Sequence, residues 1–156
     1  SIPGAFPPVL VEVEAGGRRY TEMHVDGGVT TQLFLGPAGL DWRRVRERLG
    51  VRGAPSLFLV RNARLGTRWE SIDTRLKPIV ERTISTLIRS QGIGDIARIY
   101  IDAERDGLDF NLARIPEDFD EEPAEAFDVA YMRKLYDLGQ AMGRKGYPWI
   151  RAAAAP

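Results

Sequence analysis

The sequence predicts a layered α/β fold in which an incomplete mixed sheet is flanked by helices. Short apolar runs suited to strands are interspersed with long segments in which apolar residues recur every three or four positions. The chain has 156 residues and a hydrophobic content of 44%, which is enough for one domain with a buried core. The few predicted strands make only part of a sheet, so its face and edge need partners.

The first predicted element is a β-hairpin. Apolar and acidic residues alternate from Val9 to Glu14, and a second run of period two extends from Arg18 to Val25. The two runs flank Ala15-Gly16-Gly17, and glycine-rich pairs favour the tight turns of hairpins. The second strand therefore delivers the chain to His24-Val25-Asp26-Gly27-Gly28.

The middle of the chain predicts a short helix and a buried strand. Asp41 is placed to cap a helix that stops at Gly50. Three apolar residues share one face of this helix: Trp42, Val45 and Leu49. The apolar run from Ser56 to Val60 suits a buried strand of a parallel or mixed sheet.

The second half of the chain predicts three helices and one strand. A helix begins at Thr74, Gly92 breaks it, and a second helix follows from Ile93 to Gly107. Six apolar residues form a stripe on the first of these helices: Leu76, Ile79, Val80, Ile84, Leu87 and Ile88. The alternating run from Leu108 to Ile115 predicts a strand, and Asp128 caps a last helix that Gly146 stops.

Composition excludes several functional classes. The 22 basic and 22 acidic residues cancel, so no overall field attracts nucleic acid. The absence of cysteine excludes disulfides, thiol catalysis and cysteine-ligated zinc. With one histidine, His24, the chain lacks the parts for a histidine-based zinc site, and we expect no metal or cofactor. Chemistry here therefore depends on carboxylates, hydroxyls and backbone groups.

Charge is nevertheless segregated along the sequence. Residues 41–91 hold twelve arginines or lysines against five acids, whereas residues 116–128 hold seven acids and no base. Two solvated faces, or an acidic loop lying over the basic helices, would account for this pattern. Alternatively, the basic segment contacts anionic lipid headgroups as a peripheral membrane surface.

Asp26-Gly27-Gly28 is the segment that most strongly suggests chemistry. Consecutive glycines allow crowded or left-handed backbone, so a side chain at a strand end is held beside another loop or a ligand. Asp26 is therefore placed like a catalytic or binding group. An ordinary hairpin turn is the alternative interpretation, because many Asp-Gly pairs are turns.

Two motifs in order resemble the patatin-like phospholipase family. Ser1-Ile2-Pro3-Gly4-Ala5-Phe6-Pro7-Pro8 is similar to that family's proline-rich segment, and His24-Val25-Asp26-Gly27-Gly28 is similar to its Asp-Gly-Gly element. The stretches DFNLARIPEDFD and GYPW also look like the C-terminal part of bacterial members, so the resemblance covers nearly the whole chain. It implies part of a patatin-like three-layer α/β/α fold.

The resemblance also implies a mechanism based on a Ser-Asp dyad. A serine in a G-x-S-x-G turn attacks a lipid ester carbonyl, and the aspartate takes its proton. Backbone N–H groups of a glycine-rich segment stabilise the oxyanion. By this resemblance Asp26 is the general base, supported by the loop residues Gly27 and Gly28 and by His24.

The sequence departs from that pattern in its nucleophile. None of the five serines lies in G-x-S-x-G, and the glycine-rich oxyanion segment is missing. We therefore interpret residues 1–150 as the C-terminal part of such a hydrolase domain, with 151–156 as a disordered tail. The expected partners are a lipid ester and the N-terminal part of the same protein. This chain by itself is expected to be inactive.

A non-catalytic α/β module that binds lipid or protein is the alternative function. The sequence does not specify localisation, although several bacterial members of this family resemble exported lipoproteins, which suggests an extracytoplasmic site.

Other polar and aromatic residues favour structural roles. Asp41, Asp73 and Asp128 are interpreted as helix caps, and His24 as structural or solvent-facing unless it tunes Asp26. Three tryptophans are interpreted mainly as packing residues, with lipid anchoring as the alternative: Trp42, Trp69 and Trp149.

Overall fold

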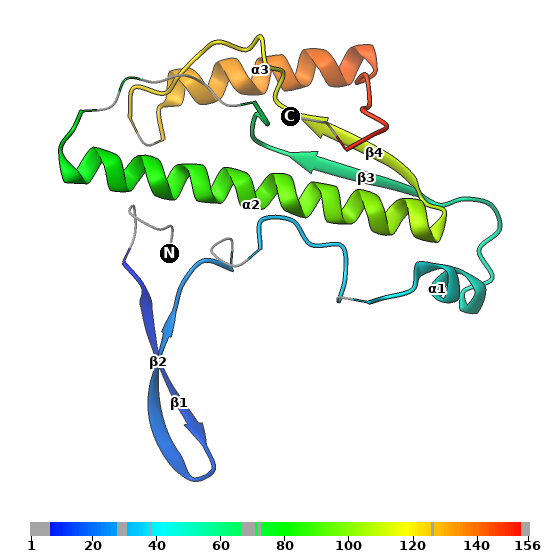
Figure 1. The fold of residues 1–156 in the computed structure, drawn as a ribbon, viewed down its shortest axis with the longest axis horizontal. Coiled ribbons are helices and arrows are strands. Elements are labelled where there is room, and N and C mark those ends of the chain that lie inside the picture. Colours follow the sequence, from blue (N-terminus) through cyan, green and yellow to red (C-terminus); the bar gives the residue numbers. More distant parts are fainter. Residues whose placement is uncertain are drawn as a thin grey trace. The chain divides into compact units, whose positions relative to one another are not determined.

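The computed structural model describes residues 7–27, 31–37, 39–66, 71, 73–125 and 127–153. Within these residues the chain is mixed α/β, with three helices and two small sheets, one antiparallel and one parallel (Figure 1). The chain divides into two compact units. We call residues 1–36 with 69–96 the hairpin unit, and residues 37–68 with 97–156 the sheet unit. The predicted α/β class is confirmed at this level.

The hairpin unit begins with the predicted hairpin. β1 (Val9–Ala15) pairs antiparallel with β2 (Arg18–His24). Gly16 and Gly17 connect them with φ values of +59° and +72°, a conformation that residues with a Cβ rarely adopt. Most apolar side chains of the hairpin remain exposed, including Leu10 and Met23.

Helix α2 (Leu76–Asp106) corrects the prediction that Gly92 breaks the helix. The helix runs without interruption for 31 residues. A glycine inside a helix costs only about 1 kcal/mol relative to alanine, so packing readily outweighs it. Gly92 is buried, and neither it nor Gly94 adopts the left-handed backbone that ends helices.

The predicted apolar stripe of α2 is only weakly covered. Leu76 and Leu87 are exposed, as are Ile79, Val80 and Ile84 between them. The buried residues lie further along the helix, at Ile96, Ile99 and Ala103.

The sheet unit is built on a parallel pair of strands. β3 (Ser56–Arg61) and β4 (Asp109–Arg114) pair with Leu57 opposite Phe110 and Leu59 opposite Leu112. A parallel pair needs a crossover connection, which here runs through α2. On the other side of β4, Leu112 and Ile150 exchange both backbone hydrogen bonds, at 2.9 and 3.0 Å.

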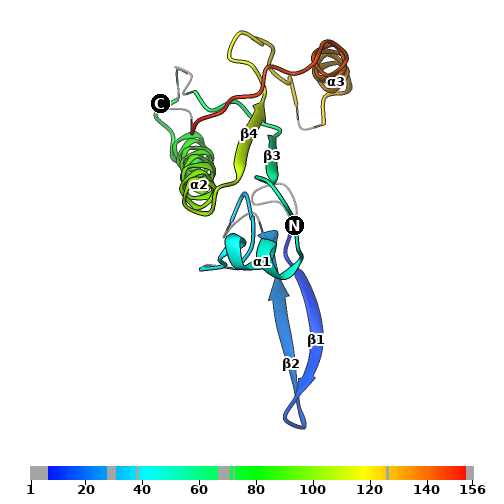
Figure 2. The same ribbon diagram turned by 90° about the vertical axis from the view of Figure 1, so that its right-hand side faces the viewer.

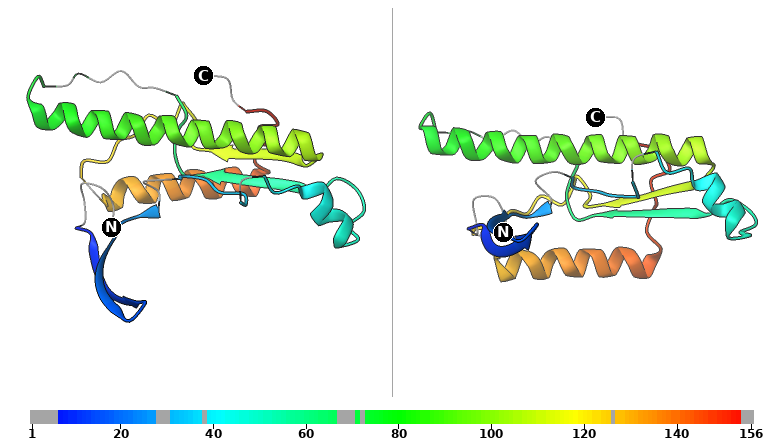
Figure 3. Two further views of the ribbon diagram at one scale, coloured as in Figure 1. Left: turned by 60° about the horizontal axis from the view of Figure 1, so that its bottom comes forward. Right: turned by 90° about the horizontal axis from the view of Figure 1, so that it is seen from below.

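Helices cover both faces of this sheet. The carboxyl-terminal part of α2 lies on one face and α3 (Val129–Lys145) on the other (Figures 2 and 3). The strand predicted from the alternating run is confirmed, but burial does not alternate along it. Four successive residues of the strand are buried: Phe110, Asn111, Leu112 and Ala113. The ring of Phe110 packs edge-on against the ring of Tyr100 in α2, with 5.2 Å between the ring centroids.

The two shorter helices have the predicted caps. Asp41 accepts from the backbone N–H groups of Arg43 and Arg44 and begins α1 (Trp42–Arg48). Asp128 accepts from Ala130 N at 2.9 Å and Tyr131 N at 3.1 Å and begins α3, which ends at Gly146 with φ +80°. None of the helices in the described part of the chain has both the length and the apolarity to cross a membrane.

Asp106 joins the end of α2 to the start of α1. Its carboxylate is almost fully buried and accepts from Trp42 N at 2.9 Å. Arg105 donates to the same carboxylate through Nε at 2.8 Å and Nη2 at 3.0 Å. Mainly because of Arg105, the pKa of Asp106 falls from 3.8 to about 2. The charged form of Asp106 therefore stabilises the sheet unit.

Gly94→Ala tests the continuity of α2. A Cβ at Gly94 meets nothing within 4 Å, so alanine should raise the free energy of unfolding by about 0.5–1 kcal/mol. Gly107 also has room for a Cβ but has φ +70°, so Gly107→Ala should lower it. Urea unfolding followed by circular dichroism measures both changes, and a destabilised Gly94→Ala protein would contradict an unbroken helix.

Asp106→Asn tests the buried carboxylate. Because the folded-state pKa is below the ordinary value of 3.8, the contribution of Asp106 is complete above about pH 4 and disappears as pH falls through about 2. Between about pH 4 and pH 2, the free energy of unfolding of Asp106→Asn should therefore fall less than that of the unsubstituted protein. Urea unfolding at several pH values measures the difference, with Asp118→Asn, an exposed carboxylate, as the control. Identical pH slopes for all three proteins would contradict the assignment.

Candidate functional site

Asp26 lies in the hairpin unit, just beyond the end of β2. Its side chain is exposed, and Val25 alone separates it from the last strand residue, His24. The hairpin turn is formed by Gly16 and Gly17 at the opposite end of β2. Asp26 is therefore a residue of a strand end, as predicted, and the interpretation of Asp26-Gly27 as a hairpin turn is wrong.

Gly27 is not held in a crowded or left-handed conformation. Its φ lies outside the left-handed region, and a Cβ built on it would meet nothing within 4 Å. Gly27 O accepts a hydrogen bond from Thr31 N at 3.1 Å, which closes the loop that follows Asp26. The space that a side chain at position 27 would enter is therefore open. Gly28, and the predicted motif residues Ser1 to Phe6, lie outside the described residues.

Asp95 anchors the segment that follows this loop. One carboxylate oxygen of Asp95 accepts from Gln32 N at 2.8 Å and from Leu33 N at 3.1 Å. The side chain belongs to α2, and Asp95 is only 6% exposed. Hydrogen bonds to a charged acceptor are stronger than neutral ones, so this contact fixes the backbone a few residues after Asp26.

Sequence reasoning missed Asp95. The signal for it was a single carboxylate within Gly92-Ile93-Gly94-Asp95-Ile96, a stretch otherwise composed of small and apolar residues. Lone acids in such stretches are buried only with partners.

The other polar residues singled out by the sequence have local partners. His24 is exposed, and its Nε2 lies 3.3 Å from Glu22 Oε2, two residues earlier on the same face of β2. Asp41 and Asp128 are caps, as expected. Asp73 accepts from Arg75 N at 3.1 Å next to the start of α2, and the hydrogen bonds from Arg75 lower the pKa of Asp73.

The tryptophans that the structure describes have packing or backbone contacts. Trp149 packs edge-on against Phe58 at 5.0 Å between ring centroids. Trp42 donates its backbone N–H to Asp106. Trp69 lies outside the described residues. In the part of the chain that the structure describes, His, Asp and Glu side chains form no group of three suited to a metal ion.

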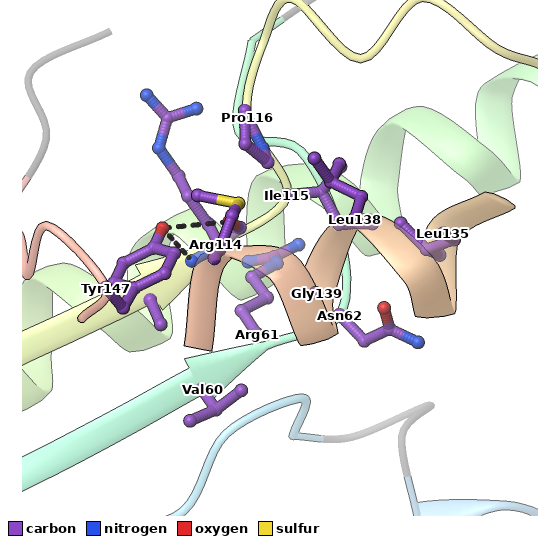
Figure 4. Close-up of a pocket in the computed structure, with 12 residues that line it drawn as sticks. Val60, Arg61, Asn62, Arg114, Ile115, Pro116, Leu135, Leu138, Gly139 and Tyr147 are labelled. Atoms are coloured by element: carbon purple, nitrogen blue, oxygen red, sulfur yellow. Dashed lines mark hydrogen bonds between the residues drawn. The ribbon is translucent and has the colours of Figure 1, made fainter. Parts of the chain in front are cut away.

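A pocket in the sheet unit is the second candidate site. It has a volume of about 280 Å³ and lies between α3 and the carboxyl ends of β3 and β4 (Figure 4). Its apolar lining includes Leu135 and Leu138 of α3, Val60 of β3, and Ile115, which follows β4. Sequence reasoning missed this pocket, because strands and helix meet there only in the tertiary structure.

Two arginines line this pocket, and none of the carboxylates in the described part of the chain does. Arg61 is 9% exposed, and in Figure 4 its side chain extends between β3 and α3. Arg114 pairs with Glu117, while its buried Nε has no acceptor among the described residues. Tyr147 closes one side, since its hydroxyl accepts from Arg114 N at 3.0 Å and donates to Arg114 O at 2.9 Å. The lining therefore combines apolar surface with two guanidinium groups, of which that of Arg114 is paired with Glu117.

The acidic segment 116–128 contacts part of the basic one. Glu117 Oε1 accepts from Leu65 N at 3.3 Å and from Gly66 N at 3.1 Å. Arg64 Nη1 donates to Phe119 O at 2.7 Å. The acidic segment therefore contacts residues 64–66 of the basic segment, mainly through backbone groups.

Comparisons of the chain with protein-family models, curated proteins and solved structures find no match. The resemblance carried by residues 1–8 and 24–29 therefore stays a prediction, and the assignment of function rests on the geometry of the site.

Asp95→Ala tests the anchor of the Asp26 segment. Removing the carboxylate leaves the N–H groups of Gln32 and Leu33 without that acceptor, at a cost of about 1–3 kcal/mol. Hydrogen exchange at these two amides should accelerate, while exchange at Asn111 in β4 should not change. Unaltered protection of Gln32 and Leu33 would show that the hydrogen bonds to Asp95 do not hold this segment.

Proposed function

We propose that this chain supplies the general-base aspartate, Asp26, of a patatin-like serine acyl hydrolase. In this proposal the serine and the oxyanion donors come from a part of the same protein outside these 156 residues. The observation that carries the proposal is the position of Asp26: it is exposed at the end of β2, beside a glycine flanked by open space. A base that serves a nucleophile from another segment has to be accessible to it.

The proposed chemistry uses Asp26 as a proton carrier. The serine oxygen attacks the ester carbonyl while its proton passes to the Asp26 carboxylate. As the tetrahedral intermediate collapses, the C–O bond to the alcohol breaks and Asp26 returns the proton to the leaving alcohol. Water then attacks the acyl-enzyme, Asp26 takes a proton from the water, and the serine recovers a proton as the carboxylic acid leaves.

The anchor formed by Asp95 supports this role. A general base has to lie within hydrogen-bond reach of the proton that it removes, which requires a defined backbone around it. Gln32 and Leu33 bind Asp95, and Thr31 N closes the loop onto Gly27 O. The described residues on either side of positions 28–30 thus have backbone hydrogen bonds.

The fold is compatible with part of a three-layer α/β/α hydrolase. β3 and β4 form a parallel pair with helices on both faces. Apolar side chains are exposed on the hairpin and on the first half of α2. We propose that the remainder of a patatin-like domain covers these side chains.

Asp26→Asn in the longer protein tests the hydrolase function. The amide cannot take the serine proton, so hydrolysis of p-nitrophenyl acyl esters should fall about 10²- to 10⁴-fold. The circular dichroism spectrum should not change, because Asp26 is exposed. Glu14→Gln is the matched control and should retain activity, since this exposed carboxylate lies at the turn end of the hairpin, away from Asp26. Full activity of Asp26→Asn would refute the proposal. If the longer protein without substitution binds lipid but does not hydrolyse esters, the non-catalytic module is favoured.

A further inference from the structure

We propose that α1 and the turn that follows it form a docking surface for an anionic membrane. We call residues 43–52 the basic patch, because these ten residues include five arginines and one glutamate. The membrane contact that the sequence suggested for residues 41–91 is thereby narrowed to one short segment. None of the residues of the basic patch is assigned to hydrolysis, and binding to a membrane does not require that activity.

The turn at the end of α1 has a defined backbone. Gly50 N donates to Glu47 O at 3.2 Å, and Val51 N donates to Arg46 O at 3.1 Å. Gly50 has φ +64°, and this left-handed residue completes a Schellman motif at the end of the helix. Arg46 Nη1 also donates to Gly53 O at 3.3 Å, which ties the helix to the chain beyond the turn. The side chains of the turn are therefore presented from a fixed backbone.

Two apolar side chains of this turn are exposed between two arginines. Leu49 is 72% exposed and Val51 is 46% exposed, and Arg48 and Arg52 flank them in the sequence. At a membrane surface, apolar side chains enter the boundary between headgroups and acyl chains, while guanidinium groups stay at the lipid phosphates. A nucleic acid would also bind the arginines through its phosphates, but phosphates do not bury apolar side chains. The combination therefore favours a lipid surface.

Two of the guanidinium groups are available to lipid phosphates. Arg48 and Arg52 are both exposed, and the side chain of neither has an ion pair or a hydrogen bond within the described part of the chain. Arg43 and Arg44, by contrast, lie 3.7 and 3.5 Å from carboxylate oxygens of Asp41. Each basic residue next to an anionic bilayer strengthens binding about fivefold. Arg48 and Arg52 therefore carry the electrostatic part of the proposed contact.

The start of α1 is fixed to the end of α2, so the basic patch is preorganised. Trp42 N donates to the buried carboxylate of Asp106 at 2.9 Å, and Arg105 Nη2 donates to Leu40 O at 3.2 Å. Figure 1 shows α1 at the end of the sheet unit where α2 ends. A surface that is already folded does not have to be ordered when it binds, which reduces the cost of docking.

Co-sedimentation of the full chain with lipid vesicles tests the proposal. Vesicles of phosphatidylcholine with about one third phosphatidylglycerol should bind the chain at about 0.1 M salt, and higher salt should weaken the binding. Vesicles of phosphatidylcholine alone should bind at least about tenfold more weakly. Combined Arg48→Gln and Arg52→Gln substitution should weaken binding to the anionic vesicles about 30-fold. Leu49→Ser should weaken it about tenfold, because the serine buries no apolar surface.

α3 provides matched controls. Combined Arg144→Gln and Lys145→Gln substitution removes the same charge from exposed residues in the last turn of α3 and should leave vesicle binding nearly unchanged. Val129→Ser, at a residue of α3 that is 67% exposed, is the control for Leu49→Ser. All four variants should retain the circular dichroism signal of the parent, since the substituted residues are exposed.

Four outcomes would overturn the proposal. They are equal binding to neutral and anionic vesicles, equal weakening by the two double substitutions, unchanged binding of Leu49→Ser, and tighter binding to duplex DNA than to anionic vesicles. None of these measurements depends on ester hydrolysis, so failure of the membrane contact and failure of the proposed catalytic role of Asp26 are distinguishable.

Discussion

Burial of β4 on both faces is the constraint on which the sheet unit depends. Leu112 is fully buried, pairs with Leu59 on one side and bonds to Ile150 on the other. Ile99 and Ala103 of α2 are also buried, and α3 lies over the opposite face. Because this strand is fixed on all sides, its last residue, Arg114, has a defined position at the edge where the pocket opens. The chemistry of that edge therefore follows from the packing of the strand.

Two buried carboxylates on α2 organise the chain outside the sheet. Asp95 accepts backbone N–H groups from Gln32 and Leu33, and Asp106 accepts one from Trp42. Each contact joins segments more than sixty residues apart in the sequence. A buried carboxylate that is paired with donors holds a loop firmly, whereas the same group without donors would be costly. A helix that is weakly amphipathic can thus still position two distant segments.

The two candidate sites differ in what they need to function. Asp26 is an exposed carboxylate whose proposed chemistry requires a nucleophile from elsewhere, so its surroundings matter through access and through the anchored segment that follows. The pocket combines apolar side chains with Arg61 and Arg114, and it is assembled within the sheet unit alone.

Local physical chemistry determined much of the secondary structure directly from sequence. The hairpin around Gly16-Gly17 and the caps at Asp41 and Asp128 depend on neighbouring residues, so patterns along the chain predicted them. The strand-end position of Asp26 followed in the same way. Tertiary structure alone decided that Gly92 stays within a helix, that β4 is buried on both faces, and that Asp95 binds Gln32 and Leu33. These outcomes depend on packing between residues distant in the sequence, whose energies exceed the local preferences that a sequence pattern records.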